Sequence, residues 1–507
     1  LDKLCYNHIL KGRSMQNFPT AASFSAFGMM LTMPREFRYD MGQLEGMDSE
    51  EVKEEVERDG GVRRKKKSRG ITIRSRIHRL TMNQAARVRK SIYGGKSFPR
   101  ARFYESSMLE SMLSREGELT AKDWRELEDC YLYLDVAAMY GSIMKYRSFP
   151  IGPHCEITTA AVLERLLKRL EEEEGDYNKL PYFIMCLDAV PNEHEVEPPL
   201  AKHDSKSGNL SWDNLPKTGR HYTSVDIGVG IKRGIRFSNP TSAIVWGTYD
   251  ESTSTWEFER AKGKILTEWI TIGEKLKKQG GAIGKTGKLI INTAYGVSLK
   301  RDFHEVTVRI TTTEQFLSYA KRPDMQCVFM DFATDGSCII AKYRRQCDGD
   351  SDLSRNAAHI GSFVLSYSHE LIDTFTMDAN PARMDGTAES VTAQPALGDT
   401  DSIFVPFTQC KQNRFMRHLR PETGYLGDDL KDLYAHICRP FAAPGSCVQC
   451  PKEGREESKY CCHEICFAKI LSIECPAPKM YALLVMLPDG TLSRVNPKSK
   501  GIPKYDL

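Results

Sequence analysis

The sequence has no run of about eighteen consecutive apolar residues, the length that a membrane-spanning helix requires, and no secretory leader opens it. It also has little net charge, only +4 over 507 residues, so the chain as a whole is not a strongly basic nucleic-acid binder. Without a secretory route, its 15 cysteines are expected as free thiols or metal ligands rather than as a disulfide framework. The chain begins with Leu1 and ends in mid-pattern, which predicts a piece of a longer protein with several domains.

A small net charge does not exclude DNA as a partner, because an acidic metal site and a basic groove nearly cancel in the sum. Charge is unevenly distributed near the N-terminus, where an acidic stretch at 47–60 is followed by a basic run at 63–69. This switch predicts a solvated insertion or loop, with nuclear targeting or a phosphate contact as the alternative.

Hydrophobic patterning predicts a mixture of strands and helices. The run YLYLD at 131–135 is typical of a buried strand that leads through a turn into a helix. Helices are expected at 160–174 and 356–376, and a hairpin is expected from Tyr481, with its turn at 488–490.

The segment 264–295 is helical in pattern but contains several glycines. This combination predicts two antiparallel helices joined at a glycine-rich tip that includes Gly280, Gly281, Gly284 and Gly287. The stretch GGAIGKTGK within it is similar to a phosphate-binding P-loop, but Gln279 stands where that pattern requires glycine.

Carboxylates in two places have the pattern of a divalent metal site. Asp135 ends the predicted strand YLYLD, and Asp399 and Asp401 lie in LGDTDSIFV, where a tight turn at Gly398 is expected to let both reach one site. Transfer of a phosphoryl group to a hydroxyl uses two metal ions held about 3.5–4 Å apart by a few carboxylates. A helix cap for Asp135 and an ordinary hairpin turn for the Asp-x-Asp pair are the alternatives.

A third element lies between these two. In KLIINTAYG, Lys288, Asn292 and Tyr295 recur at helical spacing and share one face. A lysine and an asparagine there can bind a triphosphate, and an aromatic ring can pack on base and sugar. The alternative is a helix with a solvated lysine and a core tyrosine.

Together these segments resemble the three motifs of family B DNA polymerases, in the same order. LDVAAMYGSIM resembles motif A, KLIINTAYG motif B and LGDTDS motif C. The chain departs from the family pattern at four positions: Ala138, Gly141, Thr293 and Leu397. None of them is a metal ligand, although Gly141 adjoins Tyr140.

Other segments are similar to the protein-primed branch of that family, found in phages, linear plasmids and self-synthesising transposons. KYRSFPIGPH follows motif A, residues 198–246 resemble the branch's extra insertion, and Tyr93-Gly94-Gly95 resembles its hinge motif. PKMYALLV, followed by KSKGIPK, resembles its Lys-x-Tyr motif and the basic segment downstream.

The resemblance implies a role for each matching residue. Asp135, Asp399 and Asp401 would bind two Mg²⁺ or Mn²⁺ ions. Tyr140 would stack under the incoming sugar and exclude a 2′-hydroxyl, while Lys288, Asn292 and Tyr295 would complete the nucleotide pocket. Lys479 and Tyr481 would steady the primer terminus, and Gly94 and Gly95 would contact the template.

The resemblance also implies a mixed α/β right-hand fold with palm, fingers and a partial thumb, preceded by the tail of a 3′–5′ exonuclease domain. Asp2 would be the last carboxylate of that exonuclease, whose earlier motifs this sequence lacks, so proofreading is not expected. The expected segments are an exonuclease tail (1–40), a charged insertion (41–75), the first part of the palm (76–175), an insertion (176–262), fingers (263–300), a second insertion (301–350), the second part of the palm with the cysteine cluster (351–485) and the start of the thumb (486–507).

The cysteines near the C-terminus have zinc-ligand spacing. A Cys-x-x-Cys pair precedes a second pair by about a dozen residues, a pattern that could fold a short polar loop around one ion. The candidate ligands of a structural Zn²⁺ are Cys447, Cys450, Cys462 and Cys466. Free thiols in a variable insertion, or an iron–sulfur cluster, remain as alternatives.

The expected activity is template-directed DNA synthesis. Its partners would be a DNA template and primer, deoxynucleotides and a terminal protein that supplies the priming hydroxyl, with no membrane involved. The setting would be intracellular, where a virus or mobile element replicates its DNA. A polymerase primed only by nucleic acid, a catalytically degenerate DNA-binding scaffold, and an RNA polymerase or reverse transcriptase are the alternatives.

Overall fold

The structure is a computed structural model. It describes residues 77–99, 102–135, 139–191, 198–204, 208–300, 305–322, 325–334, 336–345, 349–350, 352–354, 356–378, 397–406, 469–477, 480–487 and 489–498. The expected exonuclease tail with Asp2, the charged insertion up to 75 and the cysteine cluster lie outside the described residues. Helices and strands alternate along the described chain, which confirms the mixed α/β class.

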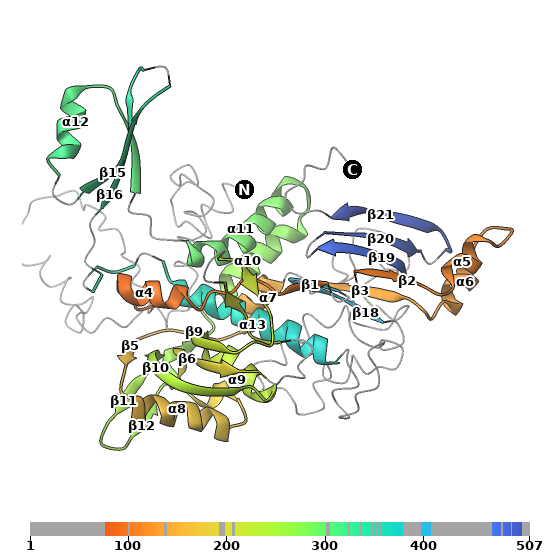
Figure 1. Cartoon of the computed structure of the whole chain (residues 1–507), viewed down its shortest axis with the longest axis horizontal. Coiled ribbons are helices and arrows are strands. Elements are labelled where there is room, and N and C mark those ends of the chain that lie inside the picture. The colour runs from red at the N-terminus through yellow and green to blue at the C-terminus, as the bar shows by residue number, and fades with distance from the viewer. Residues whose placement is uncertain are drawn as a thin grey trace, which may run out of the picture.

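The largest sheet has eight strands, and all its pairings are antiparallel. Their order is β1-β17-β18-β3-β19-β20-β21, with β2 paired to β19. The strands are β1 (Ser97–Pro99), β2 (Phe103–Glu105), β3 (Tyr131–Asp135), β17 (Leu397–Asp399), β18 (Ser402–Pro406), β19 (Lys469–Ala477), β20 (Met480–Met486) and β21 (Leu492–Lys498). The short helices α5 (Leu109–Leu113) and α6 (Ala121–Glu126) lie at its far end (Figure 1).

Two predictions on this sheet can be compared with the structure. The hairpin from Tyr481 is confirmed as β20 and β21, with the expected turn between them. The turn expected at Gly398 is wrong: Gly398 lies inside β17, opposite Ile403. Because the ladder also pairs Asp399 with Ser402, only Thr400 and Asp401 remain to make the turn.

Helix α13 (Ala358–Asp378) runs through the middle of the molecule (Figure 1), where the sequence predicts a helix. It packs against α4 (Met82–Arg89), α7 (Met139–Tyr146), α9 (Ser224–Lys232) and α11 (Gly281–Leu299). Its apolar side chains Phe363, Val364 and Tyr367 are almost completely buried in the main hydrophobic core. Such burial explains why a segment with little helix-capping signal forms a long helix.

The segment 176–262 contributes most of a second sheet, with strand order β5-β10-β6-β9. In Figure 1 this sheet lies below α13, with α8 on its outer side. Its strands and larger helix are β5 (His154–Ile157), β6 (Tyr182–Val190), β9 (Lys217–Thr223), β10 (Arg236–Trp246) and α8 (Ala160–Glu172). Smaller elements complete this region: β4 (Phe149–Pro150) with β13 (Lys262–Gly263), β7 (Lys202–His203) with β8 (Leu210–Ser211), β11 (Thr248–Asp250) with β12 (Thr255–Glu257), and the 3₁₀ turns η4 (Tyr177–Lys179) and η5 (Glu259–Ala261).

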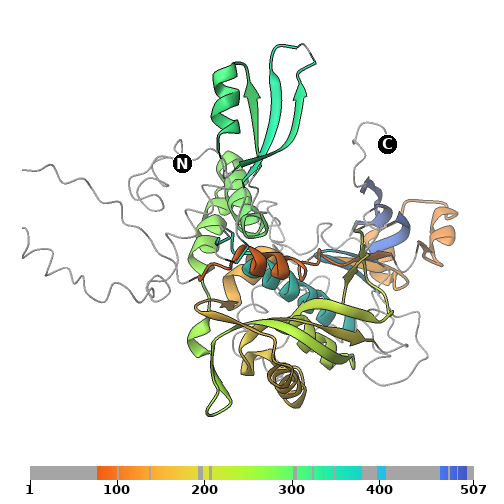
Figure 2. The ribbon, with the colours of Figure 1, turned by 60° about the vertical axis from the view of Figure 1, so that its left-hand side comes forward.

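A third folded unit follows the helix that contains KLIINTAYG. It has three antiparallel strands in the order β14-β16-β15, with one helix alongside them. Its elements are β14 (Glu305–Ile310), α12 (Thr313–Ala320), β15 (Met325–Phe332) and β16 (Ile339–Arg345). Figure 1 and Figure 2 both show it projecting away from the rest of the described chain. No described helix combines the length and the apolar character that crossing a bilayer requires.

The predicted helix pair is present as α10 (Thr267–Lys278) and α11. The helices meet at Gln279–Gly280, whereas Gly284 and Gly287 lie inside α11 and face α10. A Cβ atom at Gly287 would lie 2.6 Å from the carbonyl oxygen of Gly273, and closer still to the backbone of Lys277. These glycines therefore allow two helix backbones to approach closely, rather than forming the turn.

We expect Gly287→Ala to destabilise the protein by about 1–3 kcal/mol, because the added methyl group must push α10 and α11 apart. Gly296→Ala is the matched control, since a Cβ there meets nothing within 4 Å. In the same helix it should be neutral or stabilising by up to about 1 kcal/mol. Urea unfolding measures both variants, and equal shifts in midpoint would contradict the packing argument.

Candidate active site

Three neighbouring strands bring the predicted carboxylate positions together. Asp135, at the end of β3, pairs with Ser402 of β18, and Asp399, at the end of β17, pairs with the same Ser402 from the other side. Neighbouring strands are about 4.8 Å apart, so the Cα atoms of Asp135 and Asp399 lie about 10 Å apart. Asp401 precedes Ser402 in the chain. The pairing register thus gathers three aspartate positions at one end of the sheet.

The turn that carries Asp401 is fixed from outside the hairpin. Thr400 has a φ of 65°, a left-handed conformation that is uncommon for a residue with a branched side chain. Its N–H donates to the carbonyl oxygen of Lys96 at 2.8 Å. Strand β1 then pairs Ser97 with Asp399. The segment that contains Gly94 and Gly95 therefore runs beside the motif C turn.

Two tyrosines of the predicted nucleotide pocket stack on each other. The rings of Tyr140 in α7 and Tyr295 in α11 are 4.7 Å apart between centroids and inclined by only 3°. Burial raises the pKa of the Tyr140 hydroxyl well above its ordinary value, and the charges of Tyr295 and Asp401 raise it further. Burial also raises the pKa of Tyr295 to about 12. Both phenols are therefore neutral at physiological pH, and Tyr140 lies within electrostatic reach of Asp401.

The other two nucleotide-pocket candidates lie on the same helix as Tyr295. Lys288 and Asn292 are both exposed on α11, two turns and one turn, respectively, before the partly buried Tyr295. The spacing gives the three residues a common face. A cation and an amide that project into solvent beside an aromatic pair are suited to binding a phosphorylated, ring-containing ligand.

Residues 120–322 match the family model described as DNA polymerase type B, organellar and viral. Over these residues the chain is similar to the type B DNA polymerases. The matched range includes Asp135, Tyr140, Lys288, Asn292 and Tyr295, whereas the Asp399 and Asp401 turn lies beyond it. The family assignment confirms the resemblance that the sequence motifs indicated.

Phi29 DNA polymerase, complexed with primer-template DNA and incoming nucleotides, aligns with a TM-score of 0.45 at 14% identity. The alignment covers 84% of this chain and 56% of that one. The same polymerase with single-stranded DNA aligns with a TM-score of 0.43, also at 14% identity. The chain thus spans little more than half of the length of that polymerase, and no curated protein sequence matches it.

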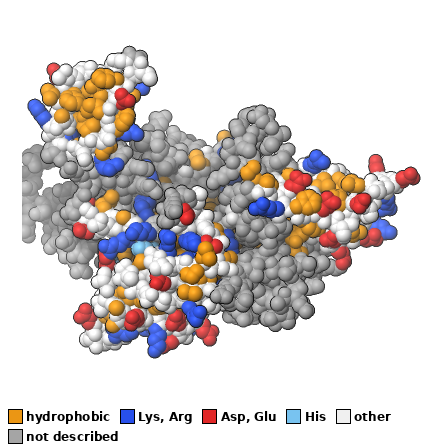
Figure 3. Space-filling view, in the orientation of Figure 1, with side chains coloured by type: hydrophobic (Ala, Val, Ile, Leu, Met, Phe, Trp, Pro, Cys, Tyr) orange, Lys and Arg blue, Asp and Glu red, His pale blue; other side chains and the backbone are white. Residues whose placement is uncertain are grey.

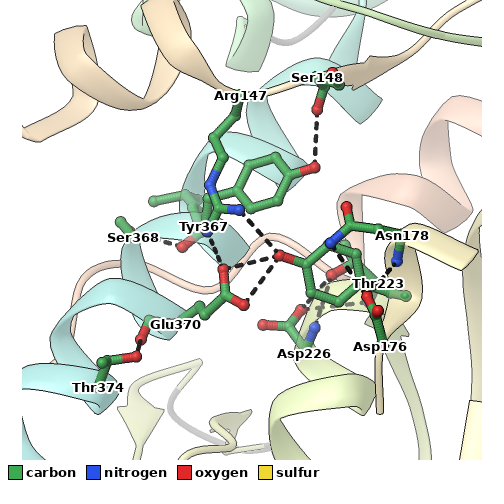
Figure 4. Close-up of polar contacts among 12 residues, drawn as sticks. Arg147, Ser148, Asp176, Asn178, Thr223, Asp226, Tyr367, Ser368, Glu370 and Thr374 are labelled. Carbon is green, nitrogen blue, oxygen red and sulfur yellow. Dashed lines mark hydrogen bonds and ion pairs between the residues drawn. The ribbon is translucent and has the colours of Figure 1, made fainter. Parts of the chain in front are cut away.

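A buried polar network fixes α7 to α13 (Figure 4). Arg147, just after α7, forms an ion pair with Glu370 and lies 4.5 Å from the ring centroid of Tyr367. The Tyr177 hydroxyl donates to both Glu370 oxygens, at 3.0 and 2.9 Å. Tyr367 donates to the carbonyl oxygen of Ser148 at 2.8 Å. These contacts tie α7, α13 and the segment 176–262 together.

Burial raises the pKa of Tyr140, and Ser368 of α13, which sequence reasoning missed, opposes that rise. The available signal was a row of polar residues in an otherwise apolar helix. Ser362, Ser366, Ser368 and His369 are all buried, and buried polar groups require partners. Spacing within the helix could not indicate which residue each one contacts.

Other predicted site residues lie elsewhere or outside the described part. Tyr481 is only 4% exposed and packs edge-on against Phe404, with 5.5 Å between ring centroids. Lys479 lies outside the described residues, as do the four cysteines proposed as zinc ligands. Their roles stay predictions.

Support for a metal site comes only from where the backbone places the three aspartates. Among side chains that the structure describes, no group of three His, Cys, Asp or Glu residues converges as a metal site. The side chains of Asp135 and Asp399 are not among those described. The backbone register of these two aspartates around Ser402, with Asp401 adjacent, nevertheless fits oxygen ligation of hard divalent ions.

We expect Glu370→Ala to cost about 3–5 kcal/mol of stability, because it leaves the Arg147 guanidinium buried without its counter-charge. The control is Glu172→Ala, which removes an exposed partner of Lys168 at 3.7 Å. That pair is expected to contribute about 0.5 kcal/mol or less. Chemical unfolding distinguishes the two.

The double variant Arg147→Met/Glu370→Leu removes both charges of the buried pair. It should recover much of the loss, since no unpaired charge remains. Equal effects of Glu370→Ala and Glu172→Ala would rule out a structural role for the network.

Proposed function

We propose that this chain carries the polymerase site of a DNA-dependent DNA polymerase, which adds deoxynucleotides to a primer 3′-hydroxyl on a DNA template. The observation that carries this proposal is the pairing of Asp135 and Asp399 with the two sides of Ser402, with Asp401 in the intervening turn. The family match to type B DNA polymerases over 120–322 supports the same reaction.

Asp135, Asp399 and Asp401 would hold two Mg²⁺ or Mn²⁺ ions. When bound, such a pair stabilises the charge that develops on the attacking and leaving oxygens. The protein's own contribution is rigid placement of the three carboxylates. Antiparallel strands buried beneath the site supply it, since Ile403 and Phe404, which follow Ser402, are fully buried.

The incoming nucleotide would lie against α11 and the tyrosine stack. Lys288 and Asn292 would contact the triphosphate from the exposed face of α11. Tyr140 would lie under the sugar, and its stacked partner Tyr295 would keep its ring in one orientation. A ring fixed in this way leaves no room for a 2′-hydroxyl.

Basic side chains offer a path for the nucleic-acid backbone. Figure 3 shows Lys and Arg side chains gathered in a row across the middle of one face, over α4. Arg87 and Arg89 lie in the last turn of α4, and the exposed Lys90 follows. We assign the template strand to the nearby segment with Gly94 and Gly95, and the primer terminus to Lys479 and Tyr481.

We further propose that synthesis can start on a hydroxyl of a terminal protein, as the segments outside motifs A to C suggest. The segment 176–262 supports this proposal, because it contributes three of the four strands of a separate sheet. The test of protein priming is whether the complete enzyme attaches a nucleotide covalently to a partner protein. Extension of DNA primers without any such attachment would favour the nucleic-acid-primed alternative.

Asp401→Asn should abolish primer extension by the complete protein on a DNA template with Mg²⁺ and deoxynucleotides. The amide keeps the size of the side chain but removes the charge that a divalent ion requires. Binding of primer-template DNA, measured by fluorescence anisotropy, should stay close to that of the wild type. If wild type and variant both bind DNA and neither extends it, the chain is a scaffold and the proposal fails.

Tyr140→Ala should raise ribonucleotide incorporation relative to deoxynucleotide incorporation by about tenfold or more, because the ring that excludes the 2′-hydroxyl is gone. Tyr140→Phe is the control, since it keeps the ring and its stacking on Tyr295. Single-nucleotide insertion kinetics give the ratio of kcat/KM values. An unchanged ratio in the alanine variant would remove Tyr140 from sugar selection.

A further inference from the structure

Gly95 makes an unusually close contact with the motif C turn. A Cβ atom at this position would lie 2.5 Å from Cγ2 of Thr400, 3.2 Å from its Cβ and 3.3 Å from its Oγ1. The first distance is far below any normal contact between carbon atoms. The missing side chain of Gly95 is therefore what allows Thr400 to lie where it does.

Thr400 has little freedom to move away from an added methyl group. Its N–H donates to the Lys96 carbonyl oxygen at 2.8 Å, so it is bonded to the residue next to Gly95. Its φ of 65° leaves few alternative conformations for a threonine. Strand pairs fix both ends of the turn, at Asp399 and Ser402. A displacement of Thr400 must therefore move Asp399 or Asp401, its immediate neighbours.

The segment around Gly95 is itself held in place. The imidazole Nε2 of the buried His369 donates to the Gly94 carbonyl oxygen at 3.0 Å. The His369 ring meets Trp212 edge-on, with centroids 4.9 Å apart, and Lys96 lies over the same indole at 5.7 Å. Helix α13 and the segment 176–262 thus clamp the residues that support the turn.

The neighbouring Gly94 has a different environment. A Cβ there would meet only Cδ2 of Leu210, at 3.6 Å, which is an ordinary contact. The pair Gly94-Gly95 thus contains one glycine that the packing requires and one that the protein's own atoms do not. If the two glycines served only to contact the template, both would be needed for the same reason. A role in seating the motif C turn involves Gly95 alone.

We propose that Gly95 is a positioning residue for the metal-binding carboxylates. It seats the Thr400–Asp401 turn against a segment that His369 and Trp212 hold, and so sets where Asp399 and Asp401 stand. The inference rests on the proposed function in one respect, namely that these aspartates bind the catalytic ions. It adds a structural origin for their placement that lies outside motifs A, B and C.

The test compares Gly95→Ala with Gly95→Ala/Thr400→Ser in the complete protein, with Thr400→Ser and Gly94→Ala as controls. Serine lacks the Cγ2 atom and so removes the closest contact. Three quantities are measured: the turnover number in primer extension, Mn²⁺ affinity of the primer-template complex by electron paramagnetic resonance, and the Kd for primer-template DNA.

Gly95→Ala should lower turnover by roughly 10²-fold and weaken Mn²⁺ binding, because displacement of a catalytic group by about 1 Å has effects of this size. Its Kd for DNA should stay near that of the wild type. Adding Thr400→Ser should restore Mn²⁺ affinity and most of the turnover towards the level of Thr400→Ser alone. Gly94→Ala should leave Mn²⁺ affinity unchanged, whatever its effect on DNA binding.

Two results would overturn the inference while leaving the polymerase assignment intact. One is weakened DNA binding by Gly95→Ala with unchanged Mn²⁺ affinity, and the other is an absence of rescue by Thr400→Ser. If Gly95→Ala does not fold, as judged by its thermal transition, the double variant must fold and extend primers, or the inference is wrong. A wild-type protein that extends no primer would defeat the proposed function itself, and the inference with it.

Discussion

The site depends on one strand-pairing register. Ser402 lies between Asp135 and Asp399, each on a neighbouring antiparallel strand, and Asp401 comes next to it in the chain. A shift of one residue in either ladder would take Asp135 or Asp399 out of its pairing with Ser402, and with it the arrangement on which the proposed metal site rests. Ile403 and Phe404 point to opposite faces of β18 and are both almost completely buried, so a slip in register would require repacking on both faces of the sheet.

Helix α13 links the parts of the molecule that surround this register. Along one helix, Ser368 lies near Tyr140 of α7, His369 bonds the backbone of Gly94, and Glu370 pairs with Arg147. A buried polar group without a partner costs about 1–3 kcal/mol, so each of these contacts strongly favours a single arrangement of its neighbours. Three consecutive residues of a helix with no catalytic motif thereby orient two segments that are far apart in the sequence: the residues around Gly94, and α7 with Arg147 at its end.

Local patterns predicted the elements better than the contacts between them. The strand before Asp135, the helix around 356–376 and the hairpin from Tyr481 are all present, because each has a clear apolar period or turn signal. The turns predicted from glycine residues were wrong at two positions. Gly398 belongs to a strand and Gly287 to a helix, since each satisfies a packing or pairing requirement that the sequence does not display. Glycine marks both turns and close backbone contacts, and only the neighbours distinguish the two.

The sequence alone indicates the kind of chemistry that we propose. Aspartates after apolar strands, with a lysine, an asparagine and a tyrosine on one helix face, define a family of reactions because those residue types are what metal ions and triphosphates require. Only the tertiary structure decided how these residues are oriented and supported. The stacking of Tyr140 on Tyr295 and the seating of Thr400 against Gly95 join segments distant in the chain. Such contacts leave no periodic trace in a sequence, because they arise from the packing of complete elements against one another.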